Sequence, residues 1–146
     1  MSRRTGRELL GLRLRLHGIQ LGQPADLLLD RESLRVVGLD IACGDGAHRY
    51  LPLLVAVVED KELSISSPLV LLEEDELGFY RTRTFSYSSL RGRPVEVAGV
   101  VAGKLVDIVI DSSGTLVEVI VDDDGRTRRI AFEDSVRFAP ATRSAA

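Results

Sequence analysis

The chain has 146 residues, of which 45% are apolar and 28% charged, and its 19 basic and 22 acidic side chains give a net charge of −3. This composition can form an apolar core, which excludes a disordered chain, and the negative charge argues against non-specific nucleic-acid binding by the whole molecule. A single cysteine, Cys43, excludes an internal disulfide framework.

The N-terminal segment, residues 1–8, is basic and is predicted to be a mobile arm. It does not have the form of a secretory signal, because Arg13 and Arg15 interrupt the apolar pattern that follows it. No apolar run in the chain reaches the roughly 20 residues that a membrane-spanning helix needs. We therefore expect a soluble, cytoplasmic protein.

A first β unit is predicted over residues 9–68. It opens with leucines that alternate with glycine and arginine from Leu10 to Leu16, a pattern typical of a strand with one buried face. A turn at His17-Gly18 leads to a strand that contains Pro24, which cannot donate to a neighbour and so predicts an edge position or a later start. Further strands are predicted at residues 35–41, 49–53 and 62–65, with a hairpin turn at residues 43–46.

Residues 69–89 are predicted to connect two halves of the chain. Ser67 is suited to cap a helix and Pro68 to its first position, so residues 69–77 are predicted to form one or two helical turns. Gly78 is predicted to end them. Residues 79–87 hold most of the aromatic side chains, and we expect them to pack across both halves.

A second β unit is predicted over residues 90–138, followed by a flexible tail at residues 139–146. Its turns are marked by Asp111-Ser112-Ser113-Gly114, which has the composition of a β-turn, and by Asp122-Asp123-Asp124-Gly125, which is suited to a hairpin. Its strands are predicted at residues 94–97, 103–110, 116–121 and 128–132, with a closing segment at 135–138.

The two units share a motif, Gly-x-x-x-Asp-x-x-x-Asp, at positions about eighty residues apart. Its residues are Gly22, Asp26 and Asp30 in the first unit and Gly103, Asp107 and Asp111 in the second. The apolar strands that follow also align, with gaps only in predicted turns, as a duplication predicts. Because units of about 50–60 residues bury little apolar surface alone, we expect the two to pack together with pseudo-twofold symmetry.

Both units resemble the PRC-barrel domain, a small β-barrel of the photosynthetic reaction-centre H subunit and of a ribosome maturation factor. The resemblance rests on Arg-Gly-Arg-Pro-Val at residues 91–95, on residues 103–107, and in the first unit on Gly11, Gly22, Asp26 and residues 51–53. The membrane helix of the H subunit and the partner domain of the maturation factor have no counterpart in this sequence. The resemblance implies an all-β fold of two small barrels in tandem with a short helical or irregular connector. It also implies a docking module that binds other proteins, with no catalytic residues.

Three groups of polar residues are compatible with chemistry but favour structural roles. Asp26 and Asp107 are predicted to accept hydrogen bonds from nearby turns, since nothing in the sequence brings them together as a carboxylate pair. The contiguous aspartates 122–124 do not have the spacing of a calcium loop. His17, His48 and Cys43 are too few to bind zinc, and a Cys43–His48 pair lacks a third group to orient it. We predict no catalytic residue, metal or cofactor.

Arginines form two clusters, one at Arg3, Arg4, Arg7, Arg13 and Arg15, and one at Arg81, Arg83, Arg91 and Arg93. The second alternates with the aromatic residues Phe79, Tyr80, Phe85 and Tyr87. Arginines beside aromatic rings can stack on single-stranded RNA; the structural alternative is a solvated face with its rings in the core. The predicted interaction surface comprises Arg13, Arg15, Phe79, Tyr80, Arg81, Arg83, Arg91 and Arg93.

The first functional hypothesis is a non-enzymatic module that binds another protein, such as a ribosomal or membrane-complex subunit. Exposed edge strands or the aromatic connector would form its docking surface, and a homodimer is compatible with it. The alternative is an RNA-binding or ribosome-assembly factor that uses the two arginine clusters. A third hypothesis, an enzyme or small-ligand binder, requires a pocket with convergent polar groups.

Overall fold

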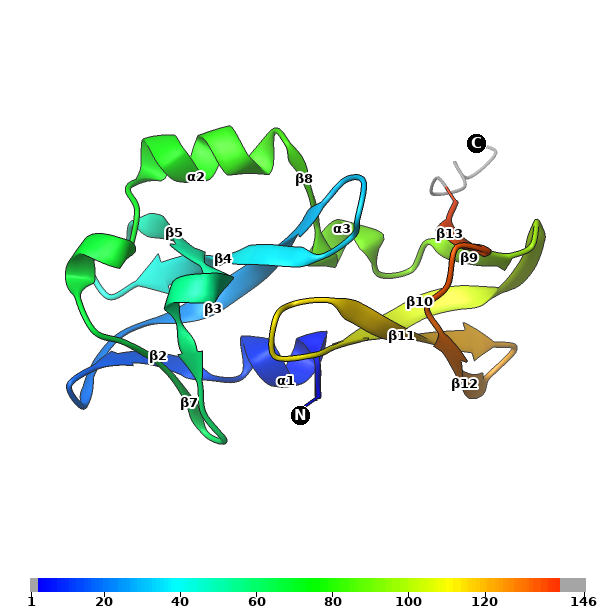
Figure 1. Cartoon of the computed structure of the whole chain (residues 1–146), viewed down its shortest axis with the longest axis horizontal. Helices are drawn as coiled ribbons and strands as arrows, with labels where there is room; N and C mark the ends of the chain where they lie inside the picture. The colour runs from blue at the N-terminus through cyan, green and yellow to red at the C-terminus, as the bar shows by residue number, and fades with distance from the viewer. Residues whose placement is uncertain (1–2, 140–146) are drawn as a thin grey trace.

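The structure is a computed structural model and describes residues 3–139. Among these residues it is built mainly of β-strands, as the alternating sequence pattern predicts, with short helices between them. The strands form two sheets, one of them curled into a half-barrel, that lie side by side along the long axis of the molecule (Figure 1). The all-β, barrel-like prediction is therefore confirmed.

The N-terminal sheet contains β2 (Arg13–Leu16), β3 (Ile19–Asp30), β4 (Val36–Cys43), β5 (His48–Pro52), β6 (Val57–Val58), β7 (Glu62–Ile65) and β8 (Thr84–Ser86). The C-terminal sheet contains β1 (Arg4–Thr5), β9 (Pro94–Val97), β10 (Val100–Ile110), β11 (Leu116–Asp123), β12 (Arg126–Ala131) and β13 (Val136–Phe138). The helices are α1 (Gly6–Leu10), α2 (Glu74–Arg81) and α3 (Tyr87–Leu90), with 3-10 turns η1 (Leu53–Val55) and η2 (Pro68–Val70).

The strand order of the N-terminal sheet is β5-β4-β3-β2-β7-β6, and that of the C-terminal sheet is β12-β11-β10-β9-β13. Tight hairpins join β2 to β3, β9 to β10 and β11 to β12. Their turn residues are His17-Gly18, Ala98-Gly99 and Asp124-Gly125, and all six have positive φ. Two successive positive φ angles are the signature of a type I′ turn, whose twist matches that of the flanking strands.

The long strands β3 and β10 have the same irregularities at matching positions. The register shifts between Pro24 and Asp26 in β3 and between Leu105 and Asp107 in β10. Each also shifts four residues later, at Leu28/Leu29 and Val109/Ile110. Because bulges bend a strand and strengthen its twist, the two sheets curve at corresponding places.

The glycine that opens each copy of the motif allows a close approach of two strands. A Cβ atom at Gly22 would lie 2.6 Å from the carbonyl oxygen of Ala42, and one at Gly103 would lie 2.6 Å from the carbonyl oxygen of Asp122. Ala42 and Asp122 hold corresponding places on β4 and β11. The motif glycines are therefore required by packing in both sheets.

Two short strands cross between the halves of the chain. The N-terminal strand β1 pairs with β10, where Arg4 is opposite Ile110 and Thr5 opposite Val109. The connector strand β8 pairs with β3, where Phe85 is opposite Leu29 and Ser86 opposite Leu28. Each short strand leads directly into a helix, α1 after β1 and α3 after β8. The segment that precedes each sheet in the sequence is thus paired with the other sheet.

The two halves share a hydrophobic core. A single cluster of buried side chains takes residues from both sheets and from both exchanged helices, among them Leu9, Leu27, Leu90, Ile108 and Val121. A smaller cluster of Leu28, Tyr50 and Leu77 lies under α2. Arg35 also donates from Nε to the carbonyl oxygen of Ser113, 2.9 Å away, which joins the β3–β4 turn to the β10–β11 turn.

The prediction of a mobile basic arm at residues 1–8 is wrong for residues 3–8. These residues lead into β1 and α1, and Leu10 ends α1 instead of beginning a strand. The cause is a capping box: Thr5 Oγ1 accepts from Glu8 N at 3.0 Å, and Glu8 Oε1 accepts from Thr5 N at 3.2 Å. Such a box satisfies two backbone donors that a helix start leaves unpaired.

The predicted helix of the connector is displaced. Ser67 does cap Pro68–Val70, because its Oγ accepts from Leu69 N at 3.2 Å, but this is only a 3-10 turn. The α-helix begins at Glu74 and continues through Gly78 to Arg81. Its three acidic residues in the first turn and its arginine in the last complement the helix dipole.

Pro24 lies within β3, so the strand does not start after the proline. β3 is also not an edge strand along its whole length. Pro24 pairs with Ile41 of β4 on one side. On the other side, β2 pairs only as far as Gly22 and β8 pairs only from Leu28 onward. The proline thus occupies a local gap where no second neighbour requires its missing N–H.

The predicted tail, residues 139–146, falls outside the described residues except for Ala139, whose N–H donates to the carbonyl oxygen of Pro94 at 2.8 Å.

The two sheets differ in their closing strands. In the C-terminal sheet, β13 runs antiparallel to β9, whereas β7 runs parallel to β2 in the N-terminal sheet and has β6 beyond it. The residues between η1 and α2 make this difference possible, because they give the N-terminal half additional chain with which to cover its sheet.

Candidate functional site: two matching strand edges

The motif aspartates hold the exchanged helices in place. Asp26 Oδ1 accepts from its neighbour Leu27 N at 2.9 Å and from Ser88 N in α3 at 3.1 Å. Asp107 Oδ1 accepts from its neighbour Ile108 N at 2.8 Å and from Arg7 N in α1 at 3.4 Å. Each carboxylate therefore satisfies a donor at the start of the helix that the other half contributes.

Tyr87 and Gly6 meet where the two exchanged helices approach each other. A Cβ atom at Gly6 would lie 2.6 Å from Cε1 of Tyr87. The Tyr87 hydroxyl donates to Asp107 Oδ1 at 2.7 Å. Burial, followed by this hydrogen bond, raises the pKa of Tyr87. The tyrosine thus spans both halves, as we expect of the aromatic connector.

The second aspartate of each motif copy, Asp30 or Asp111, orders the turn that follows it. Asp30 Oδ2 accepts from N and Oγ of Ser33, and Asp111 Oδ1 accepts from N and Oγ of Ser113, all within 2.9 Å. Hydrogen bonds from these serines lower the pKa of both carboxyl groups. Each of the four motif carboxylates therefore accepts hydrogen bonds with a structural role.

A buried carboxylate that the sequence analysis missed lies behind Asp26. Asp40 is 5% exposed and is opposite Asp26 in the ladder between β3 and β4. Its Oδ1 is 2.7 Å from His48 Nδ1, and its Oδ2 accepts from Arg81. Arg81, a residue of the predicted interaction surface, thus anchors α2 to the sheet. Asp40 and Arg81 are 41 residues apart in the sequence, so no local pattern predicts that they pair.

The connector aromatics are largely engaged by other side chains. Tyr80 stacks on Tyr50 with ring centroids 4.1 Å apart, and burial raises the pKa of Tyr50 to about 12. Phe79 is half-exposed and has the Arg83 guanidinium 3.6 Å from its ring centre. These contacts tie α2 to β5 and to its own C-terminal end.

Phe85 lies between two arginines in a shallow groove. The guanidinium carbons of Arg31 and Arg93 are 5.2 and 5.8 Å from its ring centre. The groove, of about 490 Å³, is lined also by Asp40 and Arg81. Arg93 Nε is buried without a hydrogen-bond partner among residues 3–139, while Arg31 donates to the carbonyl oxygen of Thr82 at 3.3 Å.

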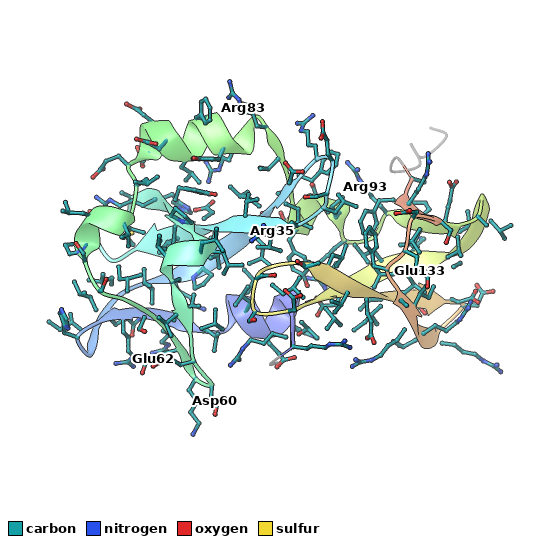
Figure 2. All side chains as sticks on the ribbon, viewed as in Figure 1. Arg35, Asp60, Glu62, Arg83, Arg93 and Glu133 are labelled. Atoms are coloured by element: carbon teal, nitrogen blue, oxygen red, sulfur yellow. The ribbon has the colours of Figure 1, made fainter. Side chains whose placement is uncertain are left out.

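The predicted interaction residues do not form one surface. Arg15 on β2 pairs with Glu62 at 3.5 Å, and Arg13 donates to Gln20 at 3.4 Å. Figure 2 shows Glu62 at the lower margin of the molecule and Arg83 at the upper margin. Arg91 is bonded through Nε to the carbonyl oxygen of Val106 at 3.2 Å. The structure therefore separates the arginines of β2 from those of the connector.

The groups weighed for metal or nucleophilic chemistry are separate. Side chains alternate between the two faces of a strand. Ala42 pairs with His48, and Asp40 lies on the same face of β4 as Ala42. Cys43 therefore projects from the opposite face of the strand. Residues 3–139 contain no group of three His, Cys, Asp or Glu side chains placed to hold a metal ion.

The outer edge of β5 is covered by the connector. Tyr50 N donates to Leu72 O at 2.9 Å, and Leu72 N donates to Tyr50 O at 2.8 Å, which makes one antiparallel bridge. The next residue, Glu73, has a carboxylate oxygen 3.6 Å from Arg49 Nε. Beyond it, α2 packs over the same strand. The strand edge thus has both backbone and charged partners.

The corresponding edge, that of β12, is open within residues 3–139. β12 is the terminal strand of its sheet and pairs only with β11. Its first four residues, Arg126 to Arg129, are exposed. In the ladder Arg129 is opposite Ile120, just as Tyr50 is opposite Asp40 in the other sheet. The N–H and C=O of Arg129 therefore point outward, as those of Tyr50 do.

The sequence analysis placed a strand at residues 128–132 but did not identify it as a site. The available signal was three arginines within four residues after an Asp-Gly turn.

No family model and no curated protein match the sequence. Among residues 3–139, no helix combines the length and apolar character needed to cross a bilayer.

Proposed function

We propose that this chain is a tandem pair of PRC-barrel-like units that acts as a non-enzymatic docking module for another protein. The pairing of the units is supported by the matching bulges of β3 and β10, by the packing of Gly22 and Gly103, and by the exchange of β1 and β8. A duplicated unit explains all three together, since each would otherwise be an independent coincidence.

The open edge of β12 carries the functional proposal. An unpaired strand edge presents backbone donors and acceptors to which an extended segment can add as a further strand. The covered edge of β5 supports this proposal, because there Leu72 makes one antiparallel bridge with both backbone groups of Tyr50. We therefore assign the partner to the edge of β12, which comprises Arg126 to Ala131.

RNA binding is the alternative to be tested against. Two of the rings that it would need for base stacking are engaged, because Tyr80 stacks on Tyr50 and Tyr87 is buried, and the half-exposed Phe79 has the Arg83 guanidinium over its ring. The three arginines of β12 could still contact phosphate. Such binding would weaken steeply with salt, because phosphate contacts release counterions.

The test is affinity capture from the native cell with the intact chain and two variants. Arg129→Pro removes the outward N–H, and proline is tolerated at an edge strand. Arg129→Ala removes the same side chain but keeps the N–H. Proteins captured by the intact chain and by Arg129→Ala, but not by a folded Arg129→Pro, are the expected result. Ribosomal proteins or membrane-complex subunits in that set would identify the assembly.

Capture that Arg129→Pro leaves unchanged would contradict docking at β12. Captured RNA that is lost at high salt, with no protein dependent on the outward N–H, would favour the alternative. Circular dichroism and an amide spectrum of each variant show that the fold is intact before capture is compared.

A further inference from the structure

The segment that covers β5 shows the chemistry that such an edge accepts. It places a backbone bridge at Leu72 and a carboxylate at Glu73 beside Arg49. Arg49 also binds Asp45 of the adjoining turn at 2.9 Å. The covering segment continues with Glu74, Asp75 and Glu76. The edge beside Arg49 is thus closed by one backbone bridge, at Leu72, that is followed directly by acidic residues at Glu73 and in the first turn of α2.

Arg128 on β12 corresponds to Arg49 on β5. It precedes the outward-facing Arg129 as Arg49 precedes Tyr50. It also has a carboxylate partner close to the turn, because Asp123, the last residue of β11, lies 3.7 Å away. Within residues 3–139, however, no carboxylate takes the place that Glu73 takes beside Arg49. The Arg128 side chain remains 53% exposed.

The charges around the edge favour an acidic partner over a basic one. Arg126, Arg128 and Arg129 lie on β12, which has no acidic residue of its own. The nearby carboxylate of Glu118 is already paired with Arg129 at 3.4 Å and with Arg3 at 3.9 Å. Asp122 and Asp123 at the end of β11, and Asp124 in the turn that follows, lie together at one end of the edge, where an acidic segment would be repelled. Favourable sites for carboxylates therefore lie along the strand.

On this basis, and resting on the proposed docking function, we propose that β12 binds an extended acidic segment of a partner protein by antiparallel strand addition. The backbone of the segment pairs with the N–H and C=O of Arg129. Its carboxylates pair with Arg128 and Arg126 on one face of the strand and with Arg129 on the other, since side chains alternate.

Two other occupants have less suitable chemistry. A second copy that paired β12 with β12 would place arginines against arginines, and like charges opposite each other destabilise a strand pair. Residues 140–146 of this chain, Pro-Ala-Thr-Arg-Ser-Ala-Ala, contain an arginine and no acid. Neither occupant would place a carboxylate beside Arg128 as Glu73 is placed beside Arg49.

The probe is a synthetic peptide with the sequence of residues 67–76, Ser-Pro-Leu-Val-Leu-Leu-Glu-Glu-Asp-Glu. Binding to the intact chain is measured by fluorescence anisotropy, and the site is mapped by amide chemical shifts and hydrogen exchange. A peptide with its four acids replaced by lysine tests charge. A peptide N-methylated at its second-last leucine, and another at its last, test the backbone bonds without altering the protein.

We expect the acidic peptide to slow exchange at the Arg129 amide and to shift Arg128, Arg129 and Ile130. The lysine peptide should bind at least tenfold more weakly, and at least one N-methylated peptide should lose tenfold or more. The double variant Arg126→Gln/Arg128→Gln should bind at least tenfold more weakly at low salt. Arg13→Gln/Arg15→Gln, which removes the same charge from β2 in the other sheet, should bind normally.

Each contrary result overturns a defined part of the proposal. If the acidic peptide does not bind, or maps to β5, the acidic occupant is wrong. If capture from cells still depends on the outward N–H, docking at β12 survives that result and only the partner chemistry falls. If sedimentation shows a dimer in which residues 70–76 of one copy cover β12 of the other, the occupant is a second copy and the proposal of a partner is wrong.

Discussion

At the scale of single residues, Gly6 and Tyr87 determine how closely the exchanged helices meet. We predict that Gly6→Ala destabilises the fold by about 1–3 kcal/mol, the usual cost of an additional carbon in a packed site. The added Cβ would lie 2.6 Å from the Tyr87 ring and 3.1 Å from Asp107 Oδ1. Urea unfolding measures the effect.

Gly11→Ala is the matched control for this substitution. Gly11 is the C-cap of α1, with φ of −81°, and a Cβ there would lie 3.4 Å from the nearest atom, Glu8 O. An alanine therefore fits the backbone and its surroundings. Equal losses at Gly6 and Gly11 would show that the approach to Tyr87 is not a packing constraint.

The buried tyrosines predict how stability depends on alkaline pH. Burial raises the pKa of Tyr50 to about 12 and raises that of Tyr87 as well. An unfolded tyrosine ionises near pH 10, so the unfolded chain loses these protons first. Their contribution to stability is complete below about pH 10 and is lost as the pH rises toward the folded-state values. Denaturant midpoints measured from pH 8 to 11.5 should therefore fall above pH 10.

Tyr87→Phe isolates one tyrosine in this experiment. It should cost about 1–2 kcal/mol at neutral pH, because Asp107 loses a hydrogen bond, and it should make the alkaline decline shallower. An unchanged slope would mean that ionisation of Tyr87 is not linked to unfolding.

At the scale of elements, the two strand edges should exchange amide hydrogen at different rates. We predict strong protection of the Tyr50 amide, which donates to Leu72 O at 2.9 Å, and fast exchange of the Arg129 amide on the open edge. Hydrogen exchange read by NMR on the intact chain compares them directly. Ile130 is the internal control, since its N–H points toward β11. Similar protection at Tyr50 and Arg129 would show that β12 is covered.

The sequence predicts those elements whose geometry depends on neighbouring residues. The hairpin at His17-Gly18 is legible because type I′ turns favour glycine, and so are the paired strands after Gly22 and Gly103. The capping box of Thr5 and Glu8 was an equally local signal that the alternating leucines obscured. The exchange of β1 and β8 could not be predicted, because two or three residues do not specify which distant strand they will join.

The same distinction applies to the candidate site. Arginine clusters are visible in the sequence, but whether a guanidinium is free depends on distant partners such as Asp40 for Arg81. The open edge of β12 is identified as a candidate site only when it is compared with the covered edge of β5. That comparison depends on the path of residues 70–73, which nothing local determines.

At the scale of the whole molecule, the exchange predicts that neither half folds alone. Residues 84–146 retain β8 and α3, which dock on the absent sheet, and lack β1 and α1, which pair with β10 and bury Leu9. Burial of one leucine contributes about 1.5–3 kcal/mol, and Asp107 would lose the N–H of Arg7. We therefore expect residues 84–146, expressed alone, to show no cooperative unfolding transition.

Co-expression with residues 3–83 is the counterpart of that experiment. Each fragment then supplies the strand and helix that the other lacks, so the two should copurify as a one-to-one complex that unfolds in a single transition. The intact chain should likewise unfold in one transition, since its main core includes side chains from both halves. A monomeric fragment 84–146 that unfolds cooperatively would mean that the C-terminal sheet is stable alone. In that case the exchanged strands and helices would not be required for the stability of the C-terminal sheet. The hydrophobic core of the molecule would then consist of two separate cores in contact.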